Sequence, residues 1–178
     1  MKLNSAKLRK IKEGELSPKS VEKHELYIIL DNVLDTYNVG AVFRLADAVA
    51  AKKIFLCGYT ETPPNTRIKK ASINTVDLTE WEHYESAAEA IRELRTQNPE
   101  LRTIAIEQSP NSIEYSKVDY KYPIALVVGN ETHGVSEEVL KIADQIVELP
   151  MFGVNVSLNV MVSLAIVLYK ALEKINYV

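Results

Sequence analysis

Short apolar runs alternate with amphipathic stretches along most of this chain. Five runs have the length and composition of strands that are buried on both faces of a sheet. These runs are 26–30, 54–57, 103–106, 124–128 and 146–149. Helical spacing of apolar residues is found between and after them, at 39–51, at 87–97, after Ser136 and at 157–174. The alternation predicts an α/β fold, with a mainly parallel sheet and helices on both faces.

Polar residues at the predicted helix starts agree with this division. Ser86 and Glu89 have the spacing of a capping box, in which the serine side chain accepts from the backbone of the first turn. Ser136 precedes an acidic first turn, which suits the helix dipole. By the same reasoning Asn38 is the predicted N-cap of the first helix, and Ser157 that of the last.

Two segments lack a clear period. Residues 1–23 are polar and basic, and they predict an N-terminal arm ahead of a domain that spans 24–178. Residues 59–80 include Pro63-Pro64-Asn65 and predict a loop. A connection of that length without structure is uncommon inside a compact domain unless it serves a function.

Composition places the chain among globular proteins, since 47% of its 178 residues are hydrophobic and 25% are charged. Its single cysteine, Cys57, cannot form an internal disulfide and lies in an apolar run, so we expect a buried thiol in a reducing compartment, the cytoplasm. The apolar C-terminal stretch is interrupted by Asn155, Asn159 and Ser163. It is therefore too polar for a membrane span.

The net charge of −3 argues mildly against a nucleic-acid partner, because phosphate contacts need Lys and Arg. Local clusters modify this argument. Arg9 and Lys10 belong to the arm, and Arg67, Lys69 and Lys70 belong to the predicted loop. These clusters are candidate RNA contacts. On charge alone, a solvated arm and a solvated loop are the simpler interpretation.

The first candidate site follows the first strand, in Asn38-Val39-Gly40-Ala41-Val42-Phe43-Arg44. Gly40 allows close approach of a backbone or a ligand. Helical spacing puts Arg44 on the same broad side as Gly40 and Asn38. An arginine there can grip a phosphate with two parallel hydrogen bonds. Taken alone, the segment is equally typical of an ordinary helix start with one surface arginine.

The second candidate site is Gly129-Asn130-Glu131-Thr132-His133-Gly134, which follows the most apolar strand. Its glycines predict a tight turn with backbone N–H groups near a ligand. The spacing is not G-x-G-x-x-G, which disfavours dinucleotide binding. No second His, Cys or Asp stands at ligand spacing from His133, so no metal site is predicted. A plain strand-to-helix turn remains an alternative.

The third candidate site runs from Pro150 to Val160 and leads into the last helix. Ser157 and Asn159 interrupt an otherwise apolar sequence. A buried amide must find hydrogen-bond partners, so Asn159 is expected to face a ligand or a neighbouring backbone. A polar residue that fixes one packing arrangement is the alternative.

Together these stretches resemble the SpoU family of RNA 2′-O-methyltransferases, within the broader SPOUT class. The family pattern N-x-G-x-x-x-R, G-N-E-x-x-G and P-M-x-G-x-x-x-S-L-N-V is complete here, in that order and at strand ends. The resemblance covers roughly residues 26–173. Tyr37 stands where the family often has proline, and Ser163 where many members have alanine.

The resemblance implies methyl transfer from S-adenosylmethionine to a ribose 2′-hydroxyl of structured RNA. It also implies a deep trefoil knot, with the tail from about Leu149 threaded through a loop, and a homodimer with the active site at its interface. No metal and no membrane are involved. Backbone groups near five residues would hold the cofactor: Ile106, Gly129, Leu149, Met151 and Leu158. The reacting end would be lined by Asn38, Arg44, Glu131, Ser157 and Asn159.

Arginine keeps its proton at any ordinary pH. We therefore expect Arg44 to clamp a phosphate and to stabilise the developing alkoxide, as one of the RNA contacts. The short chain with only a basic arm favours tRNA over ribosomal RNA as the substrate. Three alternatives stay open: a ribosomal RNA enzyme, an RNA-binding protein with an inactive cofactor pocket, and a methyltransferase acting on a small molecule or a protein.

Overall fold

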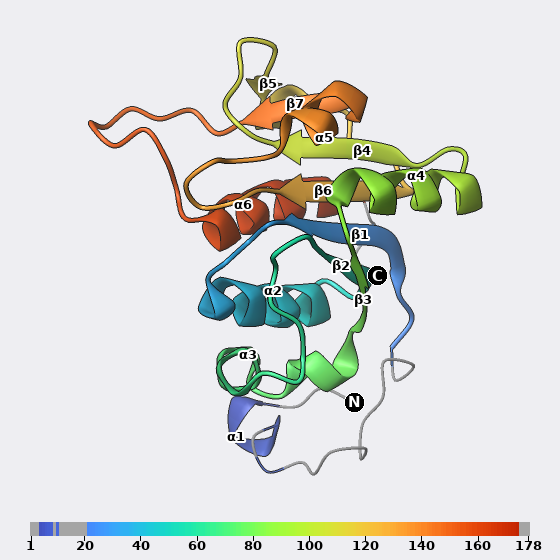
Figure 1. Cartoon of the computed structure of the whole chain (residues 1–178), viewed down its shortest axis with the longest axis vertical. Coiled ribbons are helices and arrows are strands. Elements are labelled where there is room, and N and C mark those ends of the chain that lie inside the picture. The colour runs from blue at the N-terminus through green and yellow to red at the C-terminus, as the bar shows by residue number, and fades with distance from the viewer. Residues whose placement is uncertain (1–3, 9, 11–20, 175–178) are drawn as a thin grey trace.

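The computed structural model describes residues 4–8, 10 and 21–174. In this part of the chain it contains one seven-stranded sheet with the order β3-β2-β1-β6-β4-β7-β5 (Figure 1). The strands are β1 His24–Asp31, β2 Ala51–Cys57, β3 Glu80–Tyr84, β4 Arg102–Ile106, β5 Ile113–Glu114, β6 Ile124–Val128 and β7 Gln145–Glu148. Every neighbouring pair is parallel. The predicted α/β fold with a parallel sheet is confirmed.

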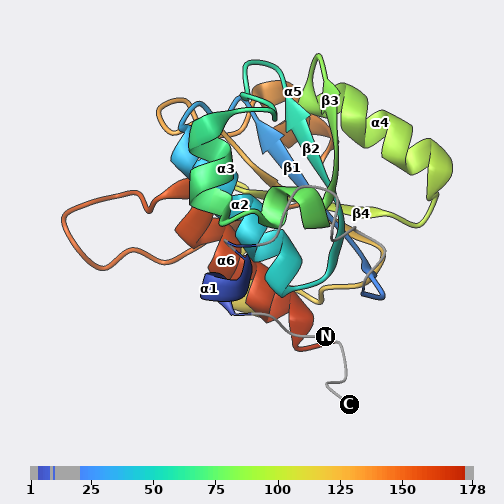
Figure 2. The same ribbon diagram turned by 90° about the horizontal axis from the view of Figure 1, so that it is seen from below.

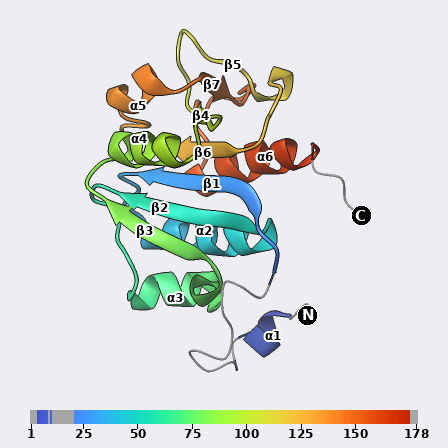
Figure 3. The same cartoon turned by 90° about the vertical axis from the view of Figure 1, so that its right-hand side faces the viewer.

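Helices cover both faces of the sheet. The helices of the described residues are α1 Ser5–Leu8, α2 Thr36–Ala48, α3 Thr66–Ser72, α4 Ala87–Gln97, α5 Glu137–Ile142 and α6 Val160–Leu172, with the 3₁₀ turns η2 Thr75–Leu78 and η3 Tyr115–Lys117. Leu26, Ile28 and Leu30 of β1 pack with α2, α3 and α6. Tyr27 and Ile29, which point the other way, pack with α4 and α5. Figure 3 shows these two layers of helices on opposite sides of the sheet.

Strand order reverses beside β1, and this reversal positions the site. The chain runs outward from β1 to β3, then returns to build the other half of the sheet from β6, β4, β7 and β5. In parallel sheets, the loops at the carboxyl ends of the strands part at such a point and leave a crevice. The loops that follow β1, β4, β6 and β7 therefore meet at one edge.

The segment 59–80 is not the predicted loop. It contains α3 and η2, and it ends at the first residue of β3. Asn65 begins α3 by accepting hydrogen bonds from the backbone of Arg67 and Ile68. Only Ile68 and Ser72 of this helix are buried, so the sequence has no apolar stripe from which to recognise it.

Two helix starts differ from the predictions, and a third helix starts where predicted but lacks the capping hydrogen bond. Asp35, not Asn38, is the N-cap of α2, and its side chain accepts from the Tyr37 backbone at 2.8 Å. Asn159, not Ser157, is the N-cap of α6. Ser136 precedes α5 but makes no side-chain capping bond. The prediction for α4 is confirmed, because Ser86 accepts from the backbone of the third helical residue.

The predicted arm, 1–23, lies largely outside the described residues. Its described part includes α1, whose Leu8 carbonyl accepts from the Asn74 side chain at 3.1 Å. Cys57 is buried as predicted, and burial raises the pKa of its thiol well above the ordinary value, with nearby Asp31 and Glu89 adding to the effect. In the described part of the chain, no helix combines the length and the apolar character needed to cross a bilayer.

Candidate functional site

A pocket of about 490 Å³ opens at the carboxyl ends of β4, β6 and β7. The segment between β7 and α6 borders it and extends away from the body of the molecule (Figures 1 and 2). The lining comes from the residues after β4, from the turn after β6 and from this segment. It includes Ile106, Glu107, Gln108, Val128, Gly129, Asn130, Glu131, Glu148, Leu149, Met151, Ser157, Leu158 and Asn159.

The turn after β6 is held by the side chain of Asn130. Its Oδ1 accepts from the backbone of Thr132 at 2.9 Å and of His133 at 3.0 Å. Its Nδ2 donates to the carbonyl of Asn32, the residue after β1, at 2.9 Å. One asparagine therefore shapes the turn and fastens it to the neighbouring strand end.

Both glycines of this turn are required by close packing. A Cβ on Gly129 would overlap the carbonyl group of Gly134. Gly134 has a φ of +69°, and a Cβ there would overlap the carboxylate of Glu107. That carboxylate accepts from the backbone of Val135 at 2.8 Å and of Gln108 at 2.9 Å. The turn is thus packed directly onto the residue that follows β4.

A chain of side-chain hydrogen bonds joins the three predicted motifs. Glu131 accepts from Asn38 Nδ2 at 3.0 Å, and Asn38 Oδ1 accepts from Asn159 Nδ2 at 3.0 Å. Glu131 also accepts from the backbone N–H groups of Leu34 and Asp35, both at 3.1 Å. Glu131 and Asn159 line the pocket, and the largely buried Asn38 lies between them.

These bonds decide the charge state of Glu131. Partial burial of the carboxylate would by itself raise its pKa, but hydrogen bonds from Asn38 and from the backbone of Leu34 and Asp35 outweigh burial. The pKa of Glu131 therefore lies below its ordinary value. At neutral pH this carboxylate is an ionised hydrogen-bond acceptor, and its low pKa makes it a poor general base.

Asn159 and Ser157 have different surroundings. Asn159 Oδ1 accepts from the backbone of Met161 at 3.0 Å and of Val162 at 3.4 Å, which caps α6. Ser157 is exposed and borders the pocket, and its backbone donates to Asn155 Oδ1 at 3.2 Å. The hydroxyl of Ser157 is therefore accessible to a ligand.

Arg44 does not line the pocket of its own chain. It is exposed on α2, and the structure gives it no hydrogen bond or ion pair within the described residues. The prediction that Asn38, Gly40 and Arg44 share one side of the helix is wrong. Gly40 packs against the backbone of α3, whereas Asn38 faces Glu131 and Asn159. Arg44 lies one helical turn after Gly40.

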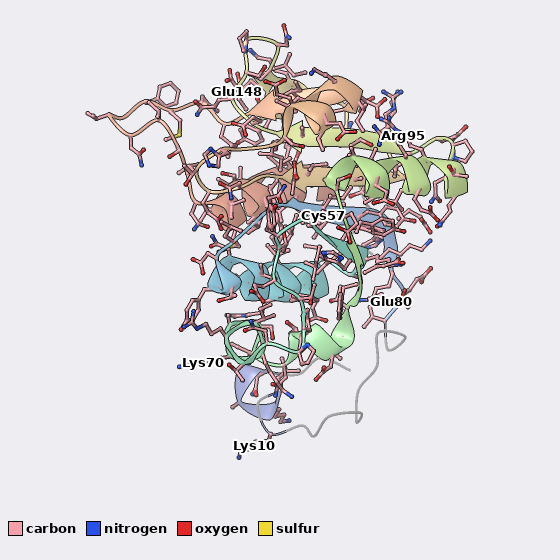
Figure 4. All side chains as sticks on the ribbon, viewed as in Figure 1. Lys10, Cys57, Lys70, Glu80, Arg95 and Glu148 are labelled. Carbon is pink, nitrogen blue, oxygen red and sulfur yellow. The ribbon has the colours of Figure 1, made fainter. Side chains whose placement is uncertain are left out.

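The predicted RNA contacts lie apart from the pocket. Arg67, Lys69 and Lys70 are exposed on α3, and Lys10 is exposed beside α1. Figure 4 shows Lys10 and Lys70 at the same end of the molecule. Arg9 lies outside the described residues.

Charge separates the pocket from this basic end. Among the described residues that line the pocket, Glu107, Glu131 and Glu148 are acidic and none is lysine or arginine. The resulting negative potential favours a cationic ligand and disfavours phosphate. The described residues contain no cluster of His, Cys, Asp or Glu that could hold a metal ion.

Sequence reasoning missed Glu107 and Gln108. Both border the pocket, and Gln108 Nε2 donates to the Val156 carbonyl at 2.6 Å, which ties the segment before α6 to the end of β4. The available signal was position, because the two residues directly follow a predicted strand. Asn130 was part of a predicted turn, but its anchoring role depends on Asn32, 98 residues away.

These features define a class: a parallel α/β domain with a cofactor-sized acidic pocket at its strand ends. Residues 25–169 match the SpoU rRNA Methylase family, and the chain belongs to this family.

Similar proteins include tRNA (guanosine(18)-2′-O)-methyltransferases. That of Aquifex aeolicus is 36% identical over 151 residues, which are 83% of this chain and 68% of the relative. That of Escherichia coli K12 is 28% identical over 150 residues, which are 83% of this chain and 62% of the relative. The chain therefore spans about two thirds of the length of these proteins.

Solved structures show the same fold. An AdoMet-bound rRNA methyltransferase from Sinorhizobium meliloti aligns with a TM-score of 0.79 at 28% identity, covering 95% of this chain and 60% of that one. The A. aeolicus TrmH/SpoU tRNA modifying enzyme aligns with a TM-score of 0.78 at 28% identity, covering 96% of this chain and 81% of that one.

Proposed function

We propose that this protein transfers a methyl group from S-adenosylmethionine to a ribose 2′-hydroxyl of RNA, in the cytoplasm and with tRNA as the substrate. The observation that carries the proposal is the hydrogen-bonded chain Glu131–Asn38–Asn159 at the rim of one pocket. It joins three sequence-distant motifs in a chain that belongs to the SpoU family. The relatives from Aquifex aeolicus and Escherichia coli are tRNA (guanosine(18)-2′-O)-methyltransferases, which favours tRNA over ribosomal RNA.

The pocket fits S-adenosylmethionine in size and in chemistry. Cofactor sites commonly measure about 300–1,000 Å³, and this pocket measures about 490 Å³. The residues proposed to hold the cofactor all line it: Ile106, Gly129, Leu149, Met151 and Leu158. The three carboxylates favour the cationic sulfonium. When bound, S-adenosylmethionine supplies an electrophilic methyl group.

The residues of the rim then orient the reacting hydroxyl. Glu131 stays ionised and holds Asn38, which in turn fixes the amide of Asn159. The exposed hydroxyl of Ser157 is available to hydrogen-bond the ribose. Arg44 would clamp an RNA phosphate and stabilise the negative charge that develops on the ribose oxygen. Because Arg44 is not among the residues that line the pocket of its own chain, we propose that a second copy supplies this arginine.

We propose a homodimer whose active site includes Arg44 of the partner subunit. Exposed apolar side chains on α6 and on the segment before it support a protein contact. They include Phe152, Val154, Val162, Ile166 and Tyr169. The deep trefoil knot expected for the family is part of the proposal. In its support, α6 packs against β4, β6 and η3, and η3 belongs to the connection between these two strands.

The test is methyl transfer from labelled S-adenosylmethionine to separate pools of unmodified tRNA and ribosomal RNA, followed by nucleoside analysis. We expect a 2′-O-methylated nucleoside from the tRNA pool. Label in ribosomal RNA alone would make the protein a ribosomal RNA enzyme. RNA binding without cofactor binding would instead support an inactive pocket.

A further inference from the structure

An exposed tyrosine, Tyr59, lies on a turn that hydrogen bonds hold to the neighbouring strands and loops. Its side chain is 83% exposed, directly after β2 at the carboxyl edge of the sheet. Scattered exposed apolar residues are common and need no explanation. Tyr59 differs because its backbone is held by a hydrogen bond whereas its ring is largely exposed to solvent.

Hydrogen bonds to neighbouring elements hold this turn. Tyr59 N donates to Asn32 Oδ1 at 3.1 Å, and Gly58 N donates to the Tyr84 carbonyl at 3.0 Å. The buried Thr60 accepts from the backbone of Val33 at 3.0 Å and donates to the Leu30 carbonyl at 3.3 Å.

Glycine is required at position 58. Its φ is +61°, and a Cβ there would overlap the Asn32 side chain. The turn that carries Tyr59 is therefore already ordered, and its ring is exposed to solvent. Binding to the ring would cost little conformational entropy in this turn.

The same anchors connect Tyr59 to the proposed reacting end. Asn32, which holds Tyr59 N through its side chain, accepts from Asn130 through its backbone carbonyl. Two and three residues further on, the N–H groups of Leu34 and Asp35 donate to Glu131. One short turn after β1 thus fixes both the exposed ring and the carboxylate of the site.

Basic side chains follow Tyr59 in the chain. Helix α3 starts at Thr66 and exposes Arg67 and Lys70. An exposed aromatic ring, followed in the chain by exposed basic residues, offers both kinds of contact that bind unpaired nucleotides, since a ring stacks on a base and cations meet phosphates. The acidic pocket repels phosphate, so the RNA backbone is expected to run over α3 instead.

We propose that Tyr59 stacks on an unpaired base of the RNA substrate and so positions the strand whose ribose is methylated. This inference rests on the proposed function, because it assumes an RNA substrate. Tyr59 does not line the pocket proposed for the cofactor, so stacking should contribute to RNA binding and not to S-adenosylmethionine affinity.

The experiment compares Tyr59→Leu with Tyr59→Phe in full-length protein, with unmodified tRNA transcripts as the probe. Leucine keeps an apolar side chain but removes the aromatic face, and phenylalanine keeps the face but removes the hydroxyl. We expect Tyr59→Leu to weaken tRNA binding roughly 5- to 100-fold and Tyr59→Phe to bind within about twofold of the parent. S-adenosylmethionine affinity, melting temperature and oligomeric state should be unchanged in both.

Tyr59→Trp in a Trp81→Phe background gives a direct readout, because Trp81 is the one tryptophan of the parent sequence. Indole emission from position 59 should be quenched when tRNA is added, and it should not respond to S-adenosylmethionine. Tyr59→Leu binding tRNA like the parent, or an unquenched tryptophan, would overturn stacking while leaving the proposed function intact. A changed oligomeric state in Tyr59→Leu would assign the ring to a protein contact and also overturn it. A parent protein that binds neither tRNA nor ribosomal RNA would refute both proposals.

Discussion

The amide of Asn38 is held between two neighbours that leave it one orientation. Ionised Glu131 can only accept, so it requires Nδ2 of Asn38. Asn159 uses its Oδ1 to cap α6 and can offer only Nδ2 to Asn38 Oδ1. The helix cap at one end and the carboxylate at the other therefore set the direction of the whole chain of hydrogen bonds.

Asn159→Asp separates the capping role of this residue from its role in that chain. Aspartate caps a helix about as well as asparagine, so the contribution of the cap to the free energy of unfolding should change by no more than about 0.5 kcal/mol. The new carboxylate at position 159, however, would face Asn38 Oδ1, and both groups are acceptors. Turning the Asn38 amide would instead place its Oδ1 against the carboxylate of Glu131. We expect methyl transfer to fall at least roughly tenfold, as displacement of reacting groups by about 1 Å can cost more than this.

Chemical denaturation and initial rates of methyl transfer measure these two effects. Asn159→Ala is the matched control, since it loses the cap as well and should cost about 1 kcal/mol of stability. Full activity in a stable Asn159→Asp protein would show that the direction of the hydrogen bonds is unimportant.

Candidate site residues could be predicted from the sequence only where they directly follow a strand or directly precede a helix. Glu131 and Asn159 were found because each is an unusual polar group directly after an apolar strand or before an apolar helix. Their connection through Asn38 spans 93 and 121 residues, and no local pattern encodes it. The grouping of Asn38 with Gly40 and Arg44 was mispredicted because residues two apart on a helix point to nearly opposite sides.

Among the elements, the buried ones were predictable and the exposed ones were not. The five apolar runs are strands β1, β2, β4, β6 and β7. Strand β3 was missed because it is an edge strand with an exposed polar face, and α3 because it buries almost nothing apolar. The last helix begins later than predicted, since the Asn159 side chain can cap and Ser157 instead stays in the preceding segment.

The segment between β7 and α6 is tied back to the sheet by Gln108. We expect Gln108→Ala to free this segment, because the bond from Gln108 Nε2 to the Val156 carbonyl is lost. A hydrogen bond of about 1 kcal/mol corresponds to roughly fivefold weaker S-adenosylmethionine binding. The melting temperature should stay the same, since Gln108 is exposed.

Calorimetric titration of the cofactor and amide hydrogen exchange at 150–158 test this expectation. Gln97→Ala is the matched control, because Gln97 donates only within α4, to Glu93. Exchange in 150–158 that is equally slow in both variants would mean that other contacts hold the segment.

At the scale of the whole molecule, charge and apolar surface are divided among three regions. The pocket is acidic, the end with α3 and α1 exposes lysine and arginine, and α6 with the segment before it exposes apolar side chains. The three regions correspond to the proposed cofactor site, the proposed RNA contact and the proposed subunit contact. The formal net charge of −3 averages over these regions, which is why composition alone argued against RNA.

A dimer that shares its active sites makes a sharp prediction about mixed variants. Arg44→Ala and Asn159→Ala should each be nearly inactive alone. In a dimer of one Arg44→Ala and one Asn159→Ala subunit, the pocket with intact Asn159 meets intact Arg44 of its partner, and the other pocket lacks both. Random exchange of subunits should therefore restore roughly a quarter of the parental activity, because half of the dimers are mixed and each has one complete site. If Arg44 served its own chain, every pocket in the mixed dimer would lack one group, and mixing would restore nothing. Rates measured before and after subunit exchange distinguish the two arrangements, with the two variants kept separate as the control.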